Sequence, residues 1–373
     1  DAVDAAARHG KVSTLIVPAD LQQAVSTEPS PDTSVVEREC LRVPTARVAE
    51  LAGVVEAAGE HAVLLLGGNG LSRRAQEAAG RIAARTGATL YSETFPARAE
   101  RGGGLPAIDR LPYFPETAIK ALDGCRVILV GAASPVAYFG YEGIPSRLAP
   151  EHLVHSLSTV DQDGEQALVE LATLLAAHDP APAPAPPVLP DASAPLDGQT
   201  VGTALAALLP EGAIVSVEGG TCGYPFFTAS AGAVAHTSLT NTGGAIGQGL
   251  PVALGASIAA PHRPVIALQS DGSALYTAQA LWTMARERSN IVVLIAANHV
   301  YNVLRTELGR HGNHDLGRQA RNLTSLDDPA LDWTALARGF GVPASRASTV
   351  AELVEQFGAA TDVVGPHLIE MAM

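Results

Sequence analysis

The sequence predicts an α/β fold made of two doubly wound domains with parallel sheets, together with a remnant of a third domain. Three observations support this prediction. Short, fully apolar segments alternate with segments of helical periodicity along most of the chain. The composition is 47% hydrophobic but only 4% aromatic and includes 36 glycines, as is typical of folded α/β proteins. The length of 373 residues is enough for about two or three domains of roughly 150 residues each.

The first predicted element is a short apolar strand near the N-terminus. Residues 11–18 have the pattern of an interior strand that ends at residues 19–20. The chain begins at Asp1 without a methionine, so we expect that the part before this strand is truncated or disordered, with an unusual processed N-terminus as the alternative. A strand without its sheet has no partner for its backbone groups, and we expect it to be disordered or docked elsewhere. A polar linker is predicted at 26–32.

The next region, residues 35–178, is predicted to be one α/β domain, the central domain. Its apolar strands alternate with helical segments, which favours a parallel sheet covered on both faces. A segment rich in glycine and proline is predicted to be a loop. The strands are expected at 62–66, 88–91 and 126–130, the helix at 75–86 and the loop at 101–115.

A proline-rich segment separates the central domain from a C-terminal domain. Seven of the sixteen residues 180–195 are proline, which supplies no backbone donor to a helix or a sheet. We therefore predict an extended linker over 179–197 and a second α/β domain over 198–373. Its strands are predicted at 213–217, 264–269, 291–297 and 367–371, and its helices at 203–209, 252–259, 275–288, 333–340 and 350–357.

Charge and cysteine content argue against several classes of protein. The 24 lysines and arginines against 38 aspartates and glutamates give a net charge of −14, so no basic patch is expected to bind a nucleic-acid backbone. No apolar run approaches the roughly 18 residues of a membrane span, and no signal peptide is recognised. The three cysteines lie far apart, which argues against a zinc knuckle or a disulfide scaffold. We expect a cytoplasmic protein without nucleic-acid or membrane partners.

Two polar residues follow neighbouring predicted strands of the C-terminal domain. Asp271 comes after strand 264–269, and Asn298 follows strand 291–297. A β-α-β crossover of this length places its strands parallel and often adjacent, and ligands bind at the carboxyl edge of such sheets. A carboxylate and an amide oxygen suit Mg²⁺ or Ca²⁺, with phosphate oxygens completing the shell. Helix capping by Asp271 and a simple strand end at Asn298 remain the alternative.

Glycine-rich turns at other strand ends favour the ligand interpretation. Residues 240–251 form one such turn before a helix of small residues, and residues 218–221 form another after strand 213–217. Backbone N–H groups in such turns can approach a phosphate closely. Each turn alone is weak evidence, but together with Asp271 and Asn298 they indicate a metal-bridged diphosphate.

These residues resemble a known family. The segment Ser270-Asp-Gly-Ser273, followed by Asn298, resembles the Gly-Asp-Gly…Asn-Asn motif of thiamine-diphosphate-dependent enzymes. Residues 270–283 are similar to the corresponding segment of benzoylformate decarboxylases, and residues 110–116 and 131–137 resemble acetolactate synthase large-subunit homologues. The resemblance covers essentially the whole chain. It implies that 198–373 is the diphosphate-binding domain and that 1–25 is the end of a pyrimidine-binding domain.

The resemblance implies a role for each matching residue. The implied metal ligands are the side chains of Asp271 and Asn298 and the backbone carbonyl of Val300. The remaining cofactor contacts involve the diphosphate, the bent shape of the cofactor, its amino group and its thiazolium ring. They are implied for Gly220, Thr221, Gly272 and Ser273 at the diphosphate, Ile246 at the bend, Gly244 at the amino group, and Tyr301 and Leu304 at the ring.

The implied reaction is decarboxylation of a 2-oxo acid on thiamine diphosphate with Mg²⁺, followed by carboligation, as in acetolactate synthase, a transferase. Release of an aldehyde, as in the lyase benzoylformate decarboxylase, and a non-catalytic cofactor-binding homologue remain alternatives. The active sites of the family form between subunits, which implies a homodimer or tetramer. FAD at residues 67–70 is possible, but the acidic residue of the full dinucleotide pattern is not evident.

The chain departs from the family pattern in three places. Ser270 replaces the first glycine of the motif and Ala297 the first asparagine, which leaves the ligand positions intact. The glutamate that activates the cofactor is expected in the pyrimidine-binding domain, before residue 1, and Glu218 matches a position in another domain. The catalytic residue is therefore not identified, and the chain alone is expected to be inactive.

Overall fold

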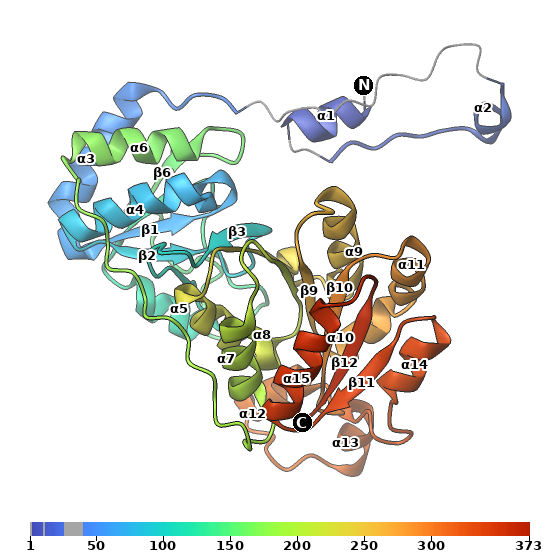
Figure 1. The fold of residues 1–373 in the computed structure, drawn as a ribbon. Helices are drawn as coiled ribbons and strands as arrows, with labels where there is room; N and C mark the ends of the chain where they lie inside the picture. The colour runs from blue at the N-terminus through green and yellow to red at the C-terminus, as the bar shows by residue number, and fades with distance from the viewer. Residues whose placement is uncertain (1, 10–11, 26–39) are drawn as a thin grey trace.

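The computed structural model describes residues 2–9, 12–25 and 40–373. The linker predicted at 26–32 and the first residues of the predicted central domain lie outside this range. Within it, the strands form two sheets, one of five strands and one of seven (Figure 1). Both sheets are predominantly parallel and covered by helices, so the α/β fold class predicted from the sequence is confirmed.

The five-stranded sheet has the order β4-β2-β1-β5-β6 and is parallel throughout. Alternate residues of the fully buried β1 face opposite layers: Leu64 and Leu66 pack in the core under α3, α4 and α6, whereas Val63 and Leu65 pack in the core with α5 (Figure 1). The elements are β1 (Ala62–Leu66), β2 (Thr89–Ser92), β4 (Asp109–Arg110), β5 (Arg126–Val130), β6 (Val154–Ser158), α3 (Thr45–Ala58), α4 (Arg73–Thr86), α5 (Pro115–Leu122) and α6 (Gly164–Leu174).

The seven-stranded sheet has the order β11-β12-β10-β9-β7-β8-β3. Helices α7, α8 and α15 cover one face, and α9, α11 and α14 cover the other. The strands are β7 (Ile214–Val217), β8 (His236–Thr240), β9 (Val265–Ser270), β10 (Ile291–Ala297), β11 (Ala344–Ala347), β12 (His367–Ala372) and β3 (Arg98–Arg101). The helices are α7 (Gly198–Leu208), α8 (Gly220–Ala229), α9 (Gly249–Ala259), α11 (Ala280–Glu287), α14 (Trp333–Gly339) and α15 (Val350–Thr361).

Strand β3 joins the two sheets in a way that the sequence did not predict. It belongs to the chain segment after β2, yet it pairs antiparallel with β8 at the edge of the other sheet. Its residues are mostly charged, so no apolar pattern marks the strand. The buried Arg101 lies over the Phe227 ring at 3.5 Å and donates to the Phe227 carbonyl at 2.6 Å. The predicted parallel sheet therefore carries one antiparallel strand at this edge, and strand β4 lies inside the predicted loop 101–115.

The helix predicted at 275–288 is interrupted in the structure. Helix α10 (Asp271–Ala274) begins directly after β9, a 3-10 turn covers Leu275–Thr277, and α11 follows. The other predicted helices of this sheet and its predicted strands are present with ends shifted by a few residues.

The N-terminal segment lies apart from both sheets (Figure 1). Residues 12–18 form no strand, and Val12 and Ile16 are 99% and 86% exposed. In the described part of the chain no neighbouring strand accepts the backbone hydrogen bonds of this segment, so it does not form a strand, in keeping with the expectation that it lacks its sheet. Helices α1 (Ala2–His9) and α2 (Ala19–Gln23) flank the segment. No helix in the described part of the chain is both long and apolar enough to cross a membrane.

Candidate functional site

Strands β9 and β10 lie side by side at the centre of the seven-stranded sheet. Their parallel register pairs Ser270 with Ala296, so the residues that follow each strand leave the sheet at the same edge. Asp271 is thereby brought next to the loop that begins at Asn298. The order of this sheet also places the end of β7 beside β9.

The Asp271 carboxylate is buried and fixed by two backbone amides. Its Oδ2 accepts a hydrogen bond from the His299 N–H at 2.6 Å, and its Oδ1 accepts one from the Gly272 N–H at 2.8 Å. Burial raises the pKa of Asp271, although both hydrogen bonds act in the opposite direction. A cation beside this carboxylate would favour its ionised form.

Asn298 connects the same loop to the start of α8. Its Oδ1 accepts from the Val300 N–H at 3.1 Å, and its Nδ2 donates to the Thr221 hydroxyl at 3.4 Å. The structure therefore brings together three of the sequence-predicted site residues: Thr221, Asn298 and Val300.

The loop after Asn298 holds an unusual backbone conformation. His299 has a φ of 55°, in the left-handed region that non-glycine residues seldom adopt. Asp271 binds its N–H, and its carbonyl accepts from the Leu326 N–H at 2.7 Å. Val300 forms an antiparallel bridge with Ser325. These contacts fix the direction of the Val300 backbone, which carries the third predicted metal ligand.

The donor chemistry of this edge fits a hard divalent cation. A carboxylate, an amide oxygen and a backbone carbonyl from two adjacent loops are the oxygen ligands that Mg²⁺ accepts, with water and phosphate as the others. Gly272 also leaves a narrow cradle, since a Cβ there would come within 2.7 Å of the Tyr301 ring. Within the described ranges, no group of three or more His, Cys, Asp or Glu side chains could hold a metal ion by itself.

Glu218 fixes the glycine-rich turn at 240–251, a role that the sequence did not predict. The buried carboxylate accepts from the Gly247 N–H and, at 2.7 Å, from the Gly249 N–H. Burial raises the pKa of Glu218 despite these two bonds. The end of β7 is thereby tied to the turn that precedes α9. The only signal in the sequence is a carboxylate at a strand end followed by glycines.

This turn contains two further predicted cofactor residues. Gly243 and Gly244 have φ values of 66° and 72°, and Ile246 is 53% exposed. The Thr277 hydroxyl donates to the Gly247 carbonyl at 2.7 Å, which links the turn to the segment after α10. No hydrogen bond in the described structure joins Gly244 or Ile246 to Asp271. The turn is therefore a part of the site distinct from the Asp271 loop.

The other predicted residues occupy the margins of the site. Gly220 is the first residue of α8, and the Ser273 hydroxyl donates to the Ser270 carbonyl at 3.0 Å. Tyr301 directly precedes α12 (Asn302–Arg310), and Leu304 is half-exposed on that helix. Ser270, which departs from the family pattern, lies against Gly219, where a Cβ would come within 2.1 Å of the Ser270 hydroxyl.

The geometry of the glycine turn after β1 disfavours a dinucleotide there. The Glu93 carboxylate lies over Gly67, so close that a Cβ on Gly67 would come within 2.6 Å of it. Asn69 of the same turn donates to the Gln162 carbonyl at 3.0 Å and accepts from the Gly164 N–H at 3.2 Å. The diphosphate of FAD would meet a carboxylate and a turn closed by its own chain, so the residues do not fit FAD at this position.

Comparisons with known proteins show to which proteins the chain is similar. Residues 224–371 match the family described as thiamine pyrophosphate enzyme, C-terminal TPP binding domain. The chain is 41% identical over 378 residues to IlvX of Mycobacterium tuberculosis, named as a candidate acetolactate synthase large subunit, and the match covers 100% of this chain and 72% of that protein. It is 34% identical over 206 residues to a benzoylformate decarboxylase of Pseudomonas aeruginosa, covering 55% of this chain and 38% of that enzyme.

Solved structures show the same fold. The thiamine diphosphate-dependent 4-hydroxybenzoylformate decarboxylase of Rhodococcus jostii RHA1 superposes with a TM-score of 0.71 at 23% identity, covering 95% of this chain and 67% of that one. The benzoylformate decarboxylase of Polynucleobacter necessarius gives 0.67 at 21% identity, covering 97% and 68%. This chain thus spans about two thirds of the length of the solved structures.

Proposed function

The chain belongs to the thiamine-diphosphate-dependent enzymes, of the type that includes acetolactate synthase and benzoylformate decarboxylase, and from that premise we propose that it binds thiamine diphosphate through Mg²⁺ and acts on 2-oxo acids. The metal ligands in this proposal are the Asp271 carboxylate, the Asn298 amide oxygen and the Val300 carbonyl. The single observation that carries the proposal is the pair of adjacent loops after β9 and β10, in which Asp271 fixes the His299 backbone.

When bound, the cofactor supplies an electron sink for cleavage of the bond to the carboxylate of a 2-oxo acid. The residues of this chain hold it in place. Asp271 and Asn298 would provide oxygen ligands for a cation that neutralises the diphosphate charge, and the phosphates would be surrounded by Gly220, Thr221, Gly272 and Ser273. The Gly244 carbonyl would accept from the cofactor amino group, and Ile246 would support the cofactor from the same turn.

Glu218 is a positioning residue in this proposal. Its two bonds to Gly247 and Gly249 leave the carboxylate engaged with the backbone and hold the turn that carries Gly244 and Ile246. We therefore do not assign to Glu218 the role of the glutamate that activates the cofactor.

We propose decarboxylation followed by carboligation, an acetolactate-synthase-like transferase reaction, as the primary activity. The match to IlvX along the whole chain supports it. A benzoylformate-decarboxylase-like lyase reaction is the second candidate, supported by the shorter match to that enzyme. Product analysis with pyruvate and with benzoylformate, carried out on a protein that also contains the pyrimidine-binding domain, separates the two. Acetolactate formation supports the first, benzaldehyde formation supports the second, and neither product in a protein that binds cofactor supports a non-catalytic homologue.

We also propose a homodimer or tetramer, as implied by family active sites that form between subunits. A cytoplasmic location is proposed as well, in keeping with the free thiols of Cys40, Cys125 and Cys222. Sedimentation velocity of the chain with and without cofactor tests the first of these proposals.

Cofactor binding is tested by isothermal titration of thiamine diphosphate with Mg²⁺ and with a chelator. We expect saturable binding that is lost with the chelator. Asn298→Ala is expected to weaken binding about tenfold or more because an oxygen ligand is removed. The matched control is Asn322→Ala, an exposed asparagine on α13 (Arg318–Thr324), which is expected to bind as the wild type does. Unchanged binding in Asn298→Ala contradicts the proposed ligand set.

A further inference from the structure

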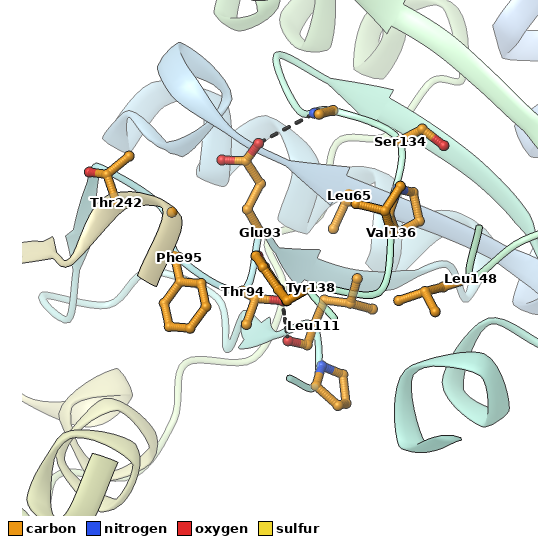
Figure 2. Close-up of a pocket in the computed structure, with 14 residues that line it drawn as sticks. Leu65, Glu93, Thr94, Phe95, Leu111, Ser134, Val136, Tyr138, Leu148 and Thr242 are labelled. Carbon is orange, nitrogen blue, oxygen red and sulfur yellow. Dashed lines mark hydrogen bonds between the residues drawn. The ribbon is translucent and has the colours of Figure 1, made fainter. Parts of the chain in front are cut away.

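A cavity of about 320 Å³ lies at the carboxyl edge of the five-stranded sheet. Its walls come from the ends of β1, β2, β4 and β5, and one side is closed by Thr242 and Gly243 of the proposed cofactor turn (Figure 2). Phe95 contacts that turn closely, since a Cβ on Gly244 would lie 3.6 Å from its ring. The cavity therefore opens beside the turn that carries Gly244 and Ile246.

The walls of the cavity are mainly apolar. Phe95 packs edge to face against Tyr138 and Tyr113, with ring centroids 5.3 Å and 5.9 Å away. Tyr113 and Tyr138 are stacked at 5.6 Å. Aliphatic side chains complete the surface, with Leu65, Leu111, Val136 and Leu148 among them. Such walls suit the methylene or ring portion of a small molecule.

Glu93 is the charged residue among the described residues that line this cavity (Figure 2). The other polar side chains of the lining are neutral, and among them the Thr94 hydroxyl donates to the Leu111 carbonyl at 2.9 Å. Glu93 follows β2 directly, and its carboxylate accepts a bond from the Ala133 N–H at 3.3 Å. Burial raises the pKa of Glu93.

Other carboxylates of the sheet edges and core have stronger hydrogen-bond or ion-pair partners than Glu93 has. Asp271 and Glu218 each accept two short bonds from backbone amides, and the buried Glu370 is paired with Arg346 at 2.8 Å. Glu93 has one long amide bond and, in the part of the chain that the structure describes, no cationic partner. A partly buried carboxylate that faces a cavity without such a partner is suited to a cation brought by a ligand.

We propose that this cavity receives the side chain of the 2-oxo acid substrate and that Glu93 selects a side chain ending in a guanidinium or ammonium group. This rests on the proposed function. A substrate whose reacting carbon lies at the thiazolium ring, between the cofactor turn and α12, can extend its side chain past Phe95 into the cavity. Its methylenes pack on the apolar walls while its charged end reaches Glu93.

The test compares two substrates that differ only in charge at the end of the side chain. Binding of 5-guanidino-2-oxopentanoate and of 2-oxo-5-ureidopentanoate to the 373-residue chain, with thiamine diphosphate and Mg²⁺ present, is measured by ligand-observed NMR titration. The guanidino compound is expected to bind about tenfold more tightly, because a charge-assisted hydrogen bond is stronger than a neutral one. Equal affinity of the wild type for the two compounds overturns the proposal, and this comparison needs no variant.

Glu93→Gln is expected to reduce the preference to within about twofold, because the side chain keeps its shape but loses its charge. The matched control is Glu142→Gln, an exposed glutamate of the loop that continues from the cavity wall, and it is expected to retain the wild-type preference. A preference that survives in a folded Glu93→Gln variant overturns the role of Glu93.

A separate calorimetric titration of thiamine diphosphate distinguishes this inference from the proposed function. Cofactor binding without any guanidino preference overturns the inference and leaves the proposed function intact. A guanidino preference without cofactor binding overturns both the proposed function and the assignment of the cavity to a substrate side chain.

Discussion

Both sheets of this protein have carboxylates at the carboxyl ends of their strands, but these carboxylates differ in their hydrogen-bond partners. In the seven-stranded sheet, Asp271 and Glu218 are each held by two backbone amides, and the loops around them are fixed by further hydrogen bonds. In the five-stranded sheet, Glu93 has one long amide bond and faces a cavity. The first edge holds its carboxylates in fixed positions, as the proposed cation site requires, whereas the second has a carboxylate beside an open cavity.

The comparison shows that a strand-end carboxylate does not define a site by itself. Its backbone partners decide whether it serves as a rigid metal ligand, a positioning group for a turn or a contact for a side chain. The two edges are therefore expected to respond differently to matched substitutions.

The largest difference is expected in ligand binding. Asp271→Asn should weaken binding of thiamine diphosphate with Mg²⁺ about a hundredfold or more, because it removes the charged ligand of the metal. Glu93→Gln should leave that binding within about twofold of the wild type. Isothermal titration of both variants measures the contrast, and comparable losses in the two would show that the edges are not independent.

Glycine substitutions are expected to reveal the difference in rigidity. Gly219→Ala should destabilise the protein by about 3 kcal/mol, because its φ of 110° and the closeness of Ser270 both oppose a Cβ. Gly67→Ala should cost only about 1 kcal/mol, since the contact is the mobile end of Glu93, which can move into the cavity.

The control is Gly255→Ala in α9, where nothing lies within 4 Å of the added Cβ and about 1 kcal/mol of stabilisation is expected. Urea unfolding gives all three free energies. A larger loss at Gly67 than at Gly219 would reverse the ranking of the two edges.

The β8 strand, which pairs with β3, contains a histidine that is expected to make the free energy of unfolding fall in acid. Burial lowers the pKa of His236 on β8 from 6.5 to about 4, so the folded protein favours the neutral ring. The stability from this group is present above pH 6.5 and is lost as the pH falls toward 4, a loss of about 3 kcal/mol. Urea unfolding at pH 7 and pH 4.5 measures it.

His236→Gln should reduce this pH dependence, because the replacement does not titrate. His155 on β6 of the other sheet has a pKa that burial also lowers, but it is more exposed. His155→Gln should therefore change the pH dependence less than His236→Gln, and the opposite order would contradict the assignment.

A smaller effect is expected where α12 meets the N-terminus of α5. Arg310 donates two bonds to Glu116, at 2.7 Å and 2.8 Å, and its guanidinium lies 4.1 Å from the centroid of the Phe114 ring. A double-mutant cycle of Arg310→Gln and Glu116→Gln should give a coupling energy of about 1 kcal/mol, because the pair is partly exposed. A coupling energy near zero would show that this ion pair does not help to hold α12 against α5.

The elements predicted correctly from the sequence are those whose positions depend on the local pattern of apolar residues. Strands β1, β5 and β10 begin and end where the apolar runs do, because each is buried on both faces. Strand β3 was missed because its charged residues are held by partners distant in sequence, with Arg101 on Phe227 as the clearest case.

The same limit applies to the candidate site. Adjacent strands made it possible to expect Asp271 near Asn298, because crossover rules govern that pairing. The bond of Asp271 to the His299 backbone, the engagement of Glu218 with the next turn and the position of Glu93 over Gly67 depend on loop conformations. No residue pattern in the sequence determines these.

The most direct test of the metal site is anomalous scattering from crystals of the 373-residue chain grown with thiamine diphosphate and Mn²⁺ in place of Mg²⁺. An anomalous peak bound by the Asp271 carboxylate, the Asn298 amide oxygen and the Val300 carbonyl is expected. A cofactor bound with its metal away from these three groups would contradict the proposed function of this edge.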